Sequence, residues 1–341
     1  MFHIEMIILG IETSCDETAA AVVEDGVKVL SNIISSQQKL HTRFGGVVPE
    51  IACRAHTESI ITVINTAIVE ANIKLDDINA ISVSNTPGLI GALLIGLTTA
   101  KTLSWILKIP LITVNHLHAH IYASKFEHED IDYPVISLVV SGGHTTLFIT
   151  HSETKHTPVG GTIDDAAGEA FDKVGKILGL GYPAGPEIDN ISRNGNERAI
   201  LFPRSYMGKD SLDFSFSGIK TAVLYHCLGQ DTKSDRAKPR LKDHEVADLA
   251  ASFQEAVVDV LVDKTIYAAI KFSTRGIILG GGVASNSRLR QRLWEAAKRR
   301  DIPLYYPSKT LCMDNAAMIA GLAYHKYQEN EFSGLEVEAV P

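Results

Sequence analysis

The feature that most constrains this fold is a strand–turn–strand pattern that occurs near residue 6 and again near residue 135. Apolar segments at residues 6–11 and 19–23 predict two strands joined by a polar turn. Segments at residues 135–140 and 145–150 predict a second pair, joined by a tight turn at residues 141–144. Because the pattern recurs while the residues themselves hardly repeat, we interpret the chain as two related halves.

Helical and extended segments alternate along the rest of the chain. Helices are predicted at residues 49–72, 88–108, 165–178, 217–228, 243–272, 287–300 and from 314 to about 327. Further strands are predicted at residues 27–35, 81–84, 110–114, 276–279 and 303–305. This alternation is typical of α/β domains, and 341 residues suffice for two of them. We expect an N-terminal domain, residues 1–130, and a C-terminal domain, residues 131–341, whose last helix returns to a cleft between them.

Charge and cysteine usage limit the functional classes. The formal net charge is −8 at pH 7, whereas nucleic-acid binders usually carry a basic surface, so such a role needs a local patch or a partner subunit. The four cysteines form no CxxC pair, which favours a reduced, cytoplasmic protein. Residues 1–10 do not resemble a signal peptide, and the apolar run 89–100 is too short to span a membrane. We therefore expect no membrane association.

The segment from His116 to His120, HLHAH, is a candidate metal site. In a helix, His116 and His120 share one face and can chelate one ion, whereas His118 points about 160° away. Histidines also cluster by chance, so the surroundings must decide. Asp314 precedes an apolar helix, where it is either the helix N-cap or the carboxylate that completes a two-histidine, one-carboxylate site.

Three turns that follow predicted strands indicate a nucleotide site. They lie at residues 12–18, 141–143 and 280–282. Backbone amides in such turns can face phosphates, and glycines allow close approach of a ligand, although glycine can also serve turn geometry alone. The chain has neither a Walker loop nor a Rossmann fingerprint. Glu12, Asp16 and Glu17 could hold Mg²⁺ with a nucleotide, or be solvated acids of the turn.

The chain matches a known family over most of its length. The matching segments are residues 10–18, 44–50, 101–102, 107–108, 110, 116–121, 139–145, 171–174, 213–218, 280–286 and 314–317. In this combination the chain resembles the tRNA threonylcarbamoyladenosine transferases, the bacterial TsaD family, once called O-sialoglycoprotein endopeptidases. The resemblance implies the actin-like ATPase (ASKHA) fold, with two related α/β domains and an inter-domain nucleotide cleft.

The resemblance also implies a reaction. The N6 amine of the adenosine beside the anticodon, in tRNAs that read codons beginning with A, attacks the carbonyl of threonylcarbamoyl-AMP, and AMP leaves. Family members in bacteria work with tRNA, a paralogous TsaB-type subunit and a TsaE-type ATPase, and the substrate is the adenylate or an adenine nucleotide.

Site residues follow from the same resemblance. His116, His120 and Asp314 look like the ligands of one divalent metal ion, Fe²⁺ or alternatively Zn²⁺. The substrate contacts would be Val139, Val140, Ser141, Gly142, Gly143, Asp172, Gly185, Asp189 and Asn286. No general base can be assigned from the sequence. Asp16 and Glu17 are the candidates, and we interpret His144 as a structural histidine.

Two departures from the family pattern stand out. Ala184 occupies a position where the family usually has glycine, which leaves the loop before Gly185 with less backbone freedom. Residues 229–242 are longer and more basic than usual. Together with residues 288–300 they could form a tRNA-binding patch, or simply a solvated loop and helix face. The basic side chains concerned are Lys233, Arg236, Lys238, Arg240, Lys242, Arg288, Arg290, Arg292, Lys298, Arg299 and Arg300.

Three other functions remain open. An actin-fold small-molecule kinase or ATPase would share the fold without needing the histidine pair. A metalloprotease would need a glutamate base as in HExxH, which residues 116–120 lack. A non-catalytic scaffold would not need intact metal and loop residues.

Overall fold

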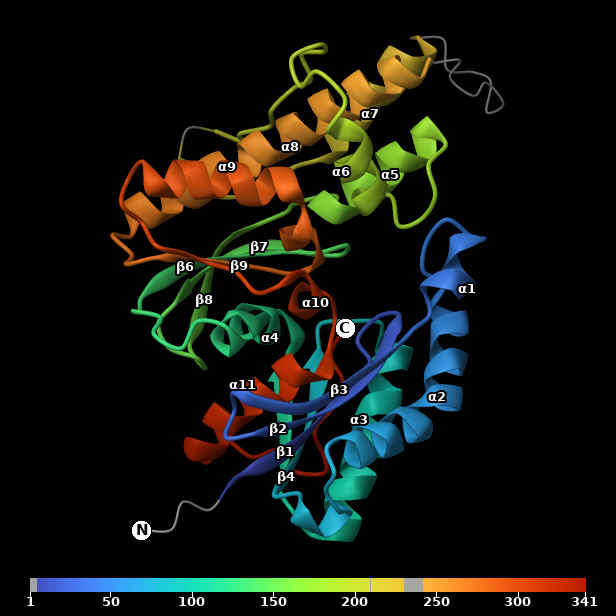
Figure 1. The fold of residues 1–341 in the computed structure, drawn as a ribbon, viewed down its shortest axis with the longest axis vertical. Helices are drawn as coiled ribbons and strands as arrows, with labels where there is room; N and C mark the ends of the chain where they lie inside the picture. The colour runs from blue at the N-terminus through green and yellow to red at the C-terminus, as the bar shows by residue number, and fades with distance from the viewer. Residues whose placement is uncertain (1–4, 209, 230–241) are drawn as a thin grey trace. The chain divides into compact units, whose positions relative to one another are not determined.

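The computed structural model describes residues 5–208, 210–229 and 242–341, which form two compact units (Figure 1). Unit 1 contains the chain up to Asp130, with Ser152–Lys155 and Thr310–Pro341. Unit 2 contains Ile131–His151 and His156–Lys309. From the sequence we expected all of residues 131–341 in one domain. In the structure Thr310–Pro341 belongs to unit 1, because the helix in this segment packs on the sheet of that unit.

Both units are built on a five-stranded sheet. The strands of unit 1 are β1 (Ile7–Glu12), β2 (Glu17–Glu24), β3 (Lys28–Ser36), β4 (Ala80–Thr86) and β5 (Leu111–Asn115), in the order β3-β2-β1-β4-β5. Those of unit 2 are β6 (Val135–Val140), β7 (Thr145–Thr150), β8 (His156–Gly161), β9 (Ile277–Gly280) and β10 (Leu304–Tyr305), in the order β10-β9-β6-β7-β8.

The two sheets have the same topology. In each, the first strand pairs antiparallel with the second and parallel with the fourth, the second pairs antiparallel with the third, and the fourth pairs parallel with the fifth. The predicted relation between the two halves is therefore confirmed. Strand β8 was missed, because the segment from His156 to Gly161 carries a proline and two glycines, which are tolerated at the edge of a sheet.

Helices cover both faces of the unit 1 sheet (Figure 1). The helices α2 (Pro49–Glu70) and α3 (Ile90–Leu107) pack on one face, and α4 (His116–Tyr122) and α11 (Ala316–Gln328) pack on the other. Helix α11 lies so close to β1 that a Cβ on Gly10 would be 2.4 Å from the Ala316 carbonyl oxygen. Short helices α1 (Gln38–Thr42) and α10 (Lys309–Cys312) were not predicted, since neither is long enough to show a hydrophobic period.

Unit 2 contains α5 (Ala167–Leu178), α6 (Gly185–Ser192), α7 (Ser217–Leu228), α8 (Asp243–Lys271) and α9 (Ser287–Lys298). The long helix α8 contacts α5, α6, α7 and α9 as well as β6, and most of its side chains from Ala247 to Ala269 are buried. It is the core helix of this unit.

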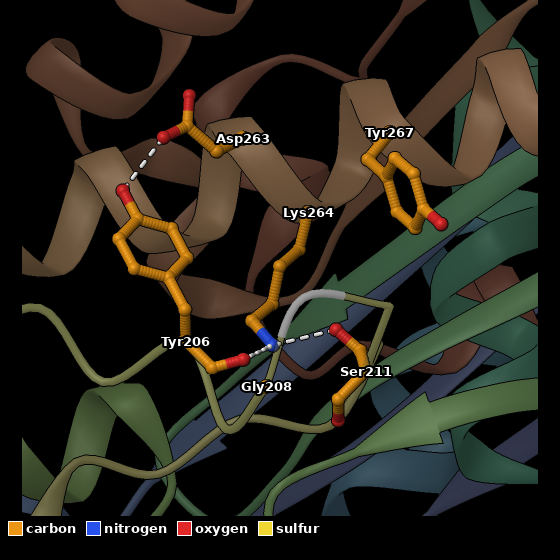
Figure 2. A pocket seen from close by; sticks show the side chains of 6 residues that line it. All are labelled: Tyr206, Gly208, Ser211, Asp263, Lys264 and Tyr267. Atoms are coloured by element: carbon orange, nitrogen blue, oxygen red, sulfur yellow. Dashed lines mark hydrogen bonds between the residues drawn. The ribbon is translucent and has the colours of Figure 1, made fainter.

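One buried lysine on α8 binds the backbone of the extended segment between α6 and α7. The Lys264 ammonium donates to the carbonyl oxygens of Tyr206 (2.8 Å), Ser211 (2.8 Å) and Asp213 (2.6 Å). Figure 2 shows this side chain at a hollow of about 380 Å³, beside the hydrogen bond from Tyr206 to Asp263. Because all three ammonium protons have acceptors, we interpret Lys264 as a structural residue.

Helix α3 is long and apolar enough, by length and composition alone, to cross a membrane, which the sequence analysis did not expect. Core helices of soluble proteins pass the same test. Leu93, Leu97 and Ala100 are buried on this helix, and Leu97 and Ala100 pack in the same core as strands β1 and β4. We therefore describe α3 as a helix of the unit 1 core.

Candidate functional site

Strand β5 leads directly into α4, which carries the two predicted metal-binding histidines. Asn115 ends the strand, and its side-chain oxygen accepts hydrogen bonds from the amides of Leu117 (2.9 Å) and His118 (3.2 Å). This N-cap starts the helix at His116 and so puts His116 and His120 one turn apart, on the one face that their spacing predicts for a helix. Their rings meet edge to face, with centroids 4.6 Å apart.

Asp314 joins this pair from a distant part of the chain. Its Oδ1 lies 3.1 Å from Nε2 of His120 and 3.5 Å from Nε2 of His116. One ligand atom from each of these three residues lies within 4.8 Å of the others. The N-cap of α11 is Asn315, whose side chain accepts from the Met318 amide at 3.0 Å. The alternative role of Asp314 as an N-cap is therefore wrong.

The three residues suit a divalent metal ion. Both histidines are buried, and two imidazoles with one carboxylate are a donor set that Fe²⁺ and Zn²⁺ accept. The buried Nδ1 of His120 has no hydrogen-bond partner among the described residues. His118 does not belong to the cluster, in agreement with its predicted direction.

Glu12 and Ser14 both contact the Nδ1 nitrogen of His116. Oε2 of Glu12 lies 2.9 Å from Nδ1 of His116, and the Ser14 hydroxyl lies 3.2 Å from the same nitrogen. The other Glu12 oxygen accepts the Ser14 amide at 2.5 Å. Glu12 is fully buried, so it is not a solvated acid of the turn, and the Ser14 amide is not free to bind a phosphate. The sequence showed no sign of this contact, because 104 residues separate its partners.

The two histidines have pKa values shifted in opposite directions, upward for His116 and downward for His120. Burial lowers the pKa of His116, but the nearby carboxylates of Glu12 and Asp314 outweigh it and raise the pKa to about 9. Burial lowers the pKa of His120, and the positive charge of His116 adds to this effect against the hydrogen bond to Asp314. Without a bound cation the site therefore holds a proton on His116, and a metal ion must displace that proton.

The turn after Glu12 carries the two candidate general bases. Burial, followed by the charges of Asp314 and Asp16, raises the pKa of Glu17 to about 9. Glu17 is then protonated near neutral pH and can donate a proton but not accept one. Burial and the same acids raise the pKa of the Cys15 thiol, so it stays unreactive.

Unit 2 contains the residues predicted to contact substrate. The side chains of Val139 and Val140 are fully buried in β6, which leaves only their backbone for a ligand. The turn is closed by hydrogen bonds from the Ser141 amide to the His144 carbonyl (2.8 Å) and from the His144 amide to the Ser141 hydroxyl (3.1 Å). At Gly142 and Gly143 an added Cβ would meet nothing within 4 Å. The packing of the fold does not require glycine at these two positions. We therefore interpret the open space beside their backbone as room for a ligand.

The glycine-rich turn after β9 has a different explanation. Gly281 has a φ of +90°, and a Cβ there would lie 2.4 Å from the Val140 carbonyl oxygen. A Cβ on Gly168, at the start of α5, would lie 2.5 Å from the Ser141 carbonyl oxygen. Both glycines allow backbone to pack against the 139–143 segment, so close packing accounts for Gly281 without a nucleotide.

The other predicted substrate residues are also engaged with the protein. Oδ1 of Asp172 accepts the Ala184 amide at 2.8 Å and so holds the loop before Gly185. The Asp189 carboxylate accepts the amide and hydroxyl of Ser287. Asn286 caps α9 through the Leu289 amide and donates to Gln254 at 2.7 Å. Asp189 therefore lies at the start of α9, where its partner Ser287 follows the N-cap Asn286 in the chain, although 98 residues separate Asp189 from Ser287.

The predicted basic patch is largely paired where the structure describes it. Arg288 and Arg292 form ion pairs with Glu255, and Arg292 also contacts Asp259. Arg290 donates to two backbone carbonyls and lies over the Tyr306 ring. The Lys298 ammonium lies over the Trp294 ring, and Arg300 donates to the Ala296 carbonyl. Residues 230–241, with Lys233, Arg236, Lys238 and Arg240, lie outside the described residues.

The chain is similar to known proteins over most of its length. A family model described as tRNA N6-adenosine threonylcarbamoyltransferase matches residues 28–321. A protein of that name from Moorella thermoacetica is 49% identical over 339 residues, covering 98% of this chain and 96% of the relative. One from Clostridium novyi is 51% identical over 339 residues, with the same coverage.

Solved structures show the fold. HypF in its phosphate- and nucleotide-bound form superposes with a TM-score of 0.62 at 15% identity, covering 96% of this chain and 47% of HypF. Component A of (R)-2-hydroxyglutaryl-CoA dehydratase from Acidaminococcus fermentans superposes with a TM-score of 0.55 at 14% identity, covering 95% and 99%. Both have the actin-like ATPase fold, which is therefore the fold of this chain.

Proposed function

The chain belongs to the family of tRNA N6-adenosine threonylcarbamoyltransferases, and from that membership we propose that it transfers a threonylcarbamoyl group from threonylcarbamoyl-AMP to tRNA. The acceptor is the N6 amine of adenosine 37, next to the anticodon, in tRNAs that read ANN codons. The observation that carries the proposal is the meeting of His116, His120 and Asp314 in a chain that matches the family over residues 28–321.

The chemistry requires an activated acyl group, because an amine attached to an aromatic ring is a poor nucleophile. Nitrogen N6 attacks the carbamoyl carbon, the bond from that carbon to the phosphate oxygen breaks, and AMP leaves with the bonding electrons. The amine loses one proton. Of the two candidates, Asp16 is the one that accepts this proton, because a protonated Glu17 can only donate one.

Unit 2 supplies the contacts we assign to the adenylate. The exposed backbone at Gly142 and Gly143 can approach its phosphate or carbonyl oxygen, where amides stabilise negative charge. Asp172, Gly185, Asp189 and Asn286 are the further substrate residues, with carboxylates suited to the hydroxyls of ribose or threonine. Since Asp189 and Asn286 already hold α9, substrate contacts use their remaining acceptor capacity.

Unit 1 supplies the metal site. His116, His120 and Asp314 would hold one divalent ion, and we propose Fe²⁺, with Zn²⁺ as the alternative. Such an ion would act as a Lewis acid toward a carbonyl or phosphate oxygen. Mg²⁺ would accompany a bound nucleotide.

Partners follow from the proposed reaction. We infer that the protein acts in the cytoplasm on its tRNA substrate, with a paralogous TsaB-type subunit and a TsaE-type ATPase as its partners. Exposed apolar side chains on α2 and α3 are the candidates for contact with a partner. Among them Val69 is 75% exposed and Trp105 is 69% exposed.

A transfer assay tests the proposal. The purified protein is incubated with its partners, unmodified tRNA and threonylcarbamoyl-AMP, and mass spectrometry follows AMP release and the modified adenosine. We expect His116→Ala and His120→Ala to abolish both metal content and transfer. His118→Gln, which removes a histidine from the same helix outside the cluster, is the matched control and should retain metal.

Other outcomes identify other functions. Phosphorylation of a small molecule without tRNA would indicate a kinase, and cleavage of a glycoprotein would indicate a protease. Full transfer by a variant that binds no metal would remove the proposed role of the ion.

A further inference from the structure

Glu12 is a buried carboxylate with a defined partner for each oxygen. It is the last residue of β1, where the sheet fixes its backbone, and its side chain is fully buried. Oε1 accepts the Ser14 amide at 2.5 Å, and Oε2 lies 2.9 Å from Nδ1 of His116. The same residue was one of the candidate Mg²⁺ acids, but neither of its oxygens is open to solvent or to a second ion.

This contact decides which nitrogen of His116 carries the proton. An ionised carboxylate only accepts hydrogen bonds, so Nδ1 must be the protonated nitrogen when a neutral His116 faces Glu12. Nε2 then has the free lone pair, and Nε2 is the atom directed at Asp314. The Ser14 hydroxyl also reaches Nδ1, at 3.2 Å, but a hydroxyl can donate or accept and so cannot choose between the two tautomers.

We propose that Glu12 is a positioning residue of the metal site, which holds His116 in the tautomer that presents Nε2 to a divalent cation. The inference rests on the metal site of the proposed function and adds a residue to it. Glu12 also places a second negative charge near the three ligands, so that Glu12 and Asp314 together balance a charge of +2. His120 has no such partner at its Nδ1 among the described residues.

Glu12→Gln tests this role with almost no change in shape. The two donors that now meet two carboxylate oxygens, the Ser14 amide and Nδ1–H, would share a single amide oxygen. If the glutamine amide nitrogen faces His116 instead, it donates to Nδ1 and drives the ring proton to Nε2, the ligating atom. Loss of such a partner typically weakens metal affinity about 10- to 100-fold.

The assay measures Zn²⁺ binding to the full-length protein by competition with a chromogenic chelator, without any substrate. Glu24→Gln is the matched control, because it makes the same substitution in β2, the strand paired with β1, at the end of that pair away from Glu12, and among the described residues Glu24 contacts Lys28 and neither histidine. We expect Glu12→Gln to raise the Kd for Zn²⁺ by about 10- to 100-fold and Glu24→Gln to change it by less than about 3-fold. Equal effects of the two substitutions would attribute the loss to general electrostatics and overturn the proposal.

A measurement on the unmodified protein keeps the inference testable if Glu12→Gln does not fold. In the Zn²⁺-loaded protein, nitrogen NMR of the histidine rings should show His116 coordinated through Nε2, with a proton on Nδ1 that is shifted downfield by its carboxylate partner. Coordination of His116 through Nδ1 would refute the role of Glu12.

The two proposals fail in different ways. If the unmodified protein binds no Zn²⁺, the metal site itself is wrong and the role of Glu12 falls with it. If the unmodified protein and Glu12→Gln bind Zn²⁺ equally well, the metal site stands and only the role of Glu12 is refuted.

Discussion

Gly175 and Ala184 make a steric pair whose effect on stability can be measured directly. Gly175 is buried in α5, and a Cβ at this position would lie 2.0 Å from the Cβ of Ala184. Ala184 is fully buried at the residue before α6. We therefore infer that Gly175 makes the space that the Ala184 methyl group fills, and that Gly175→Ala is tolerated only together with Ala184→Gly.

Two opposing contributions determine how much Gly175→Ala changes the free energy of unfolding. Alanine is favoured over glycine inside a helix by about 1 kcal/mol. Against this, two methyl carbons need a separation of roughly 3.5–4 Å, so the loop must move by about 1.5–2 Å, and such overpacking typically costs about 1–3 kcal/mol. Movement is opposed by the hydrogen bond from the Ala184 amide to Asp172, which places the cost near the upper end. We expect Gly175→Ala to destabilise unit 2 by about 2 kcal/mol.

The double substitution separates these terms. With Ala184→Gly in place the overlap disappears, so Gly175→Ala should stabilise the protein by about 1 kcal/mol relative to Ala184→Gly alone. The coupling free energy between the two positions is the difference between these effects, about 3 kcal/mol.

Urea unfolding of the full chain provides the assay. The chain has two tryptophans, Trp105 in unit 1 and Trp294 in unit 2, so a Trp105→Phe background makes fluorescence a reporter of unit 2. The unmodified background, the two single variants and the double variant form a double-mutant cycle. Their unfolding free energies are compared on condition that their m-values are equal. Additivity of the two substitutions within about 0.5 kcal/mol would show that the loop adapts freely and would refute the packing argument.

Two further predictions concern the side chains of Lys264 and His118. Lys264→Met should destabilise unit 2 by about 3 kcal/mol, measured by the same fluorescence assay, because three carbonyl oxygens lose their donor, while Zn²⁺ content stays unchanged. Burial, aided by the charge of Lys326, lowers the pKa of His118 to about 4, so the folded protein keeps this residue neutral where the unfolded chain, with a pKa near 6.5, binds a proton. Stability from His118 is therefore complete above about pH 6.5 and is lost as the pH falls toward 4, by about 2 kcal/mol at pH 5. In chelator-treated protein, His118→Gln should lose less stability than the unmodified protein between pH 7.5 and pH 5, and equal losses would contradict the assignment.

Local patterns in the sequence were enough to predict most elements of the fold. The apolar segments predicted the paired strands, and the spacing of His116 and His120 predicted that a helix would put both on one face. These are properties of a few neighbouring residues, set by backbone period and helix capping, so the sequence carries them without a tertiary structure.

Contacts between distant residues were decided only by the tertiary structure. Asp314 reaches His120 across 194 residues because Asn315, its neighbour, takes over the helix cap. Glu12 looked like a turn acid, but β1 buries it against His116. Arg288 and Arg292 looked like a nucleic-acid surface, but α8 supplies their acidic partners. In each case the sequence shows the charge of a residue, whereas the packing of elements decides whether that charge meets an ion, a proton or an opposite charge.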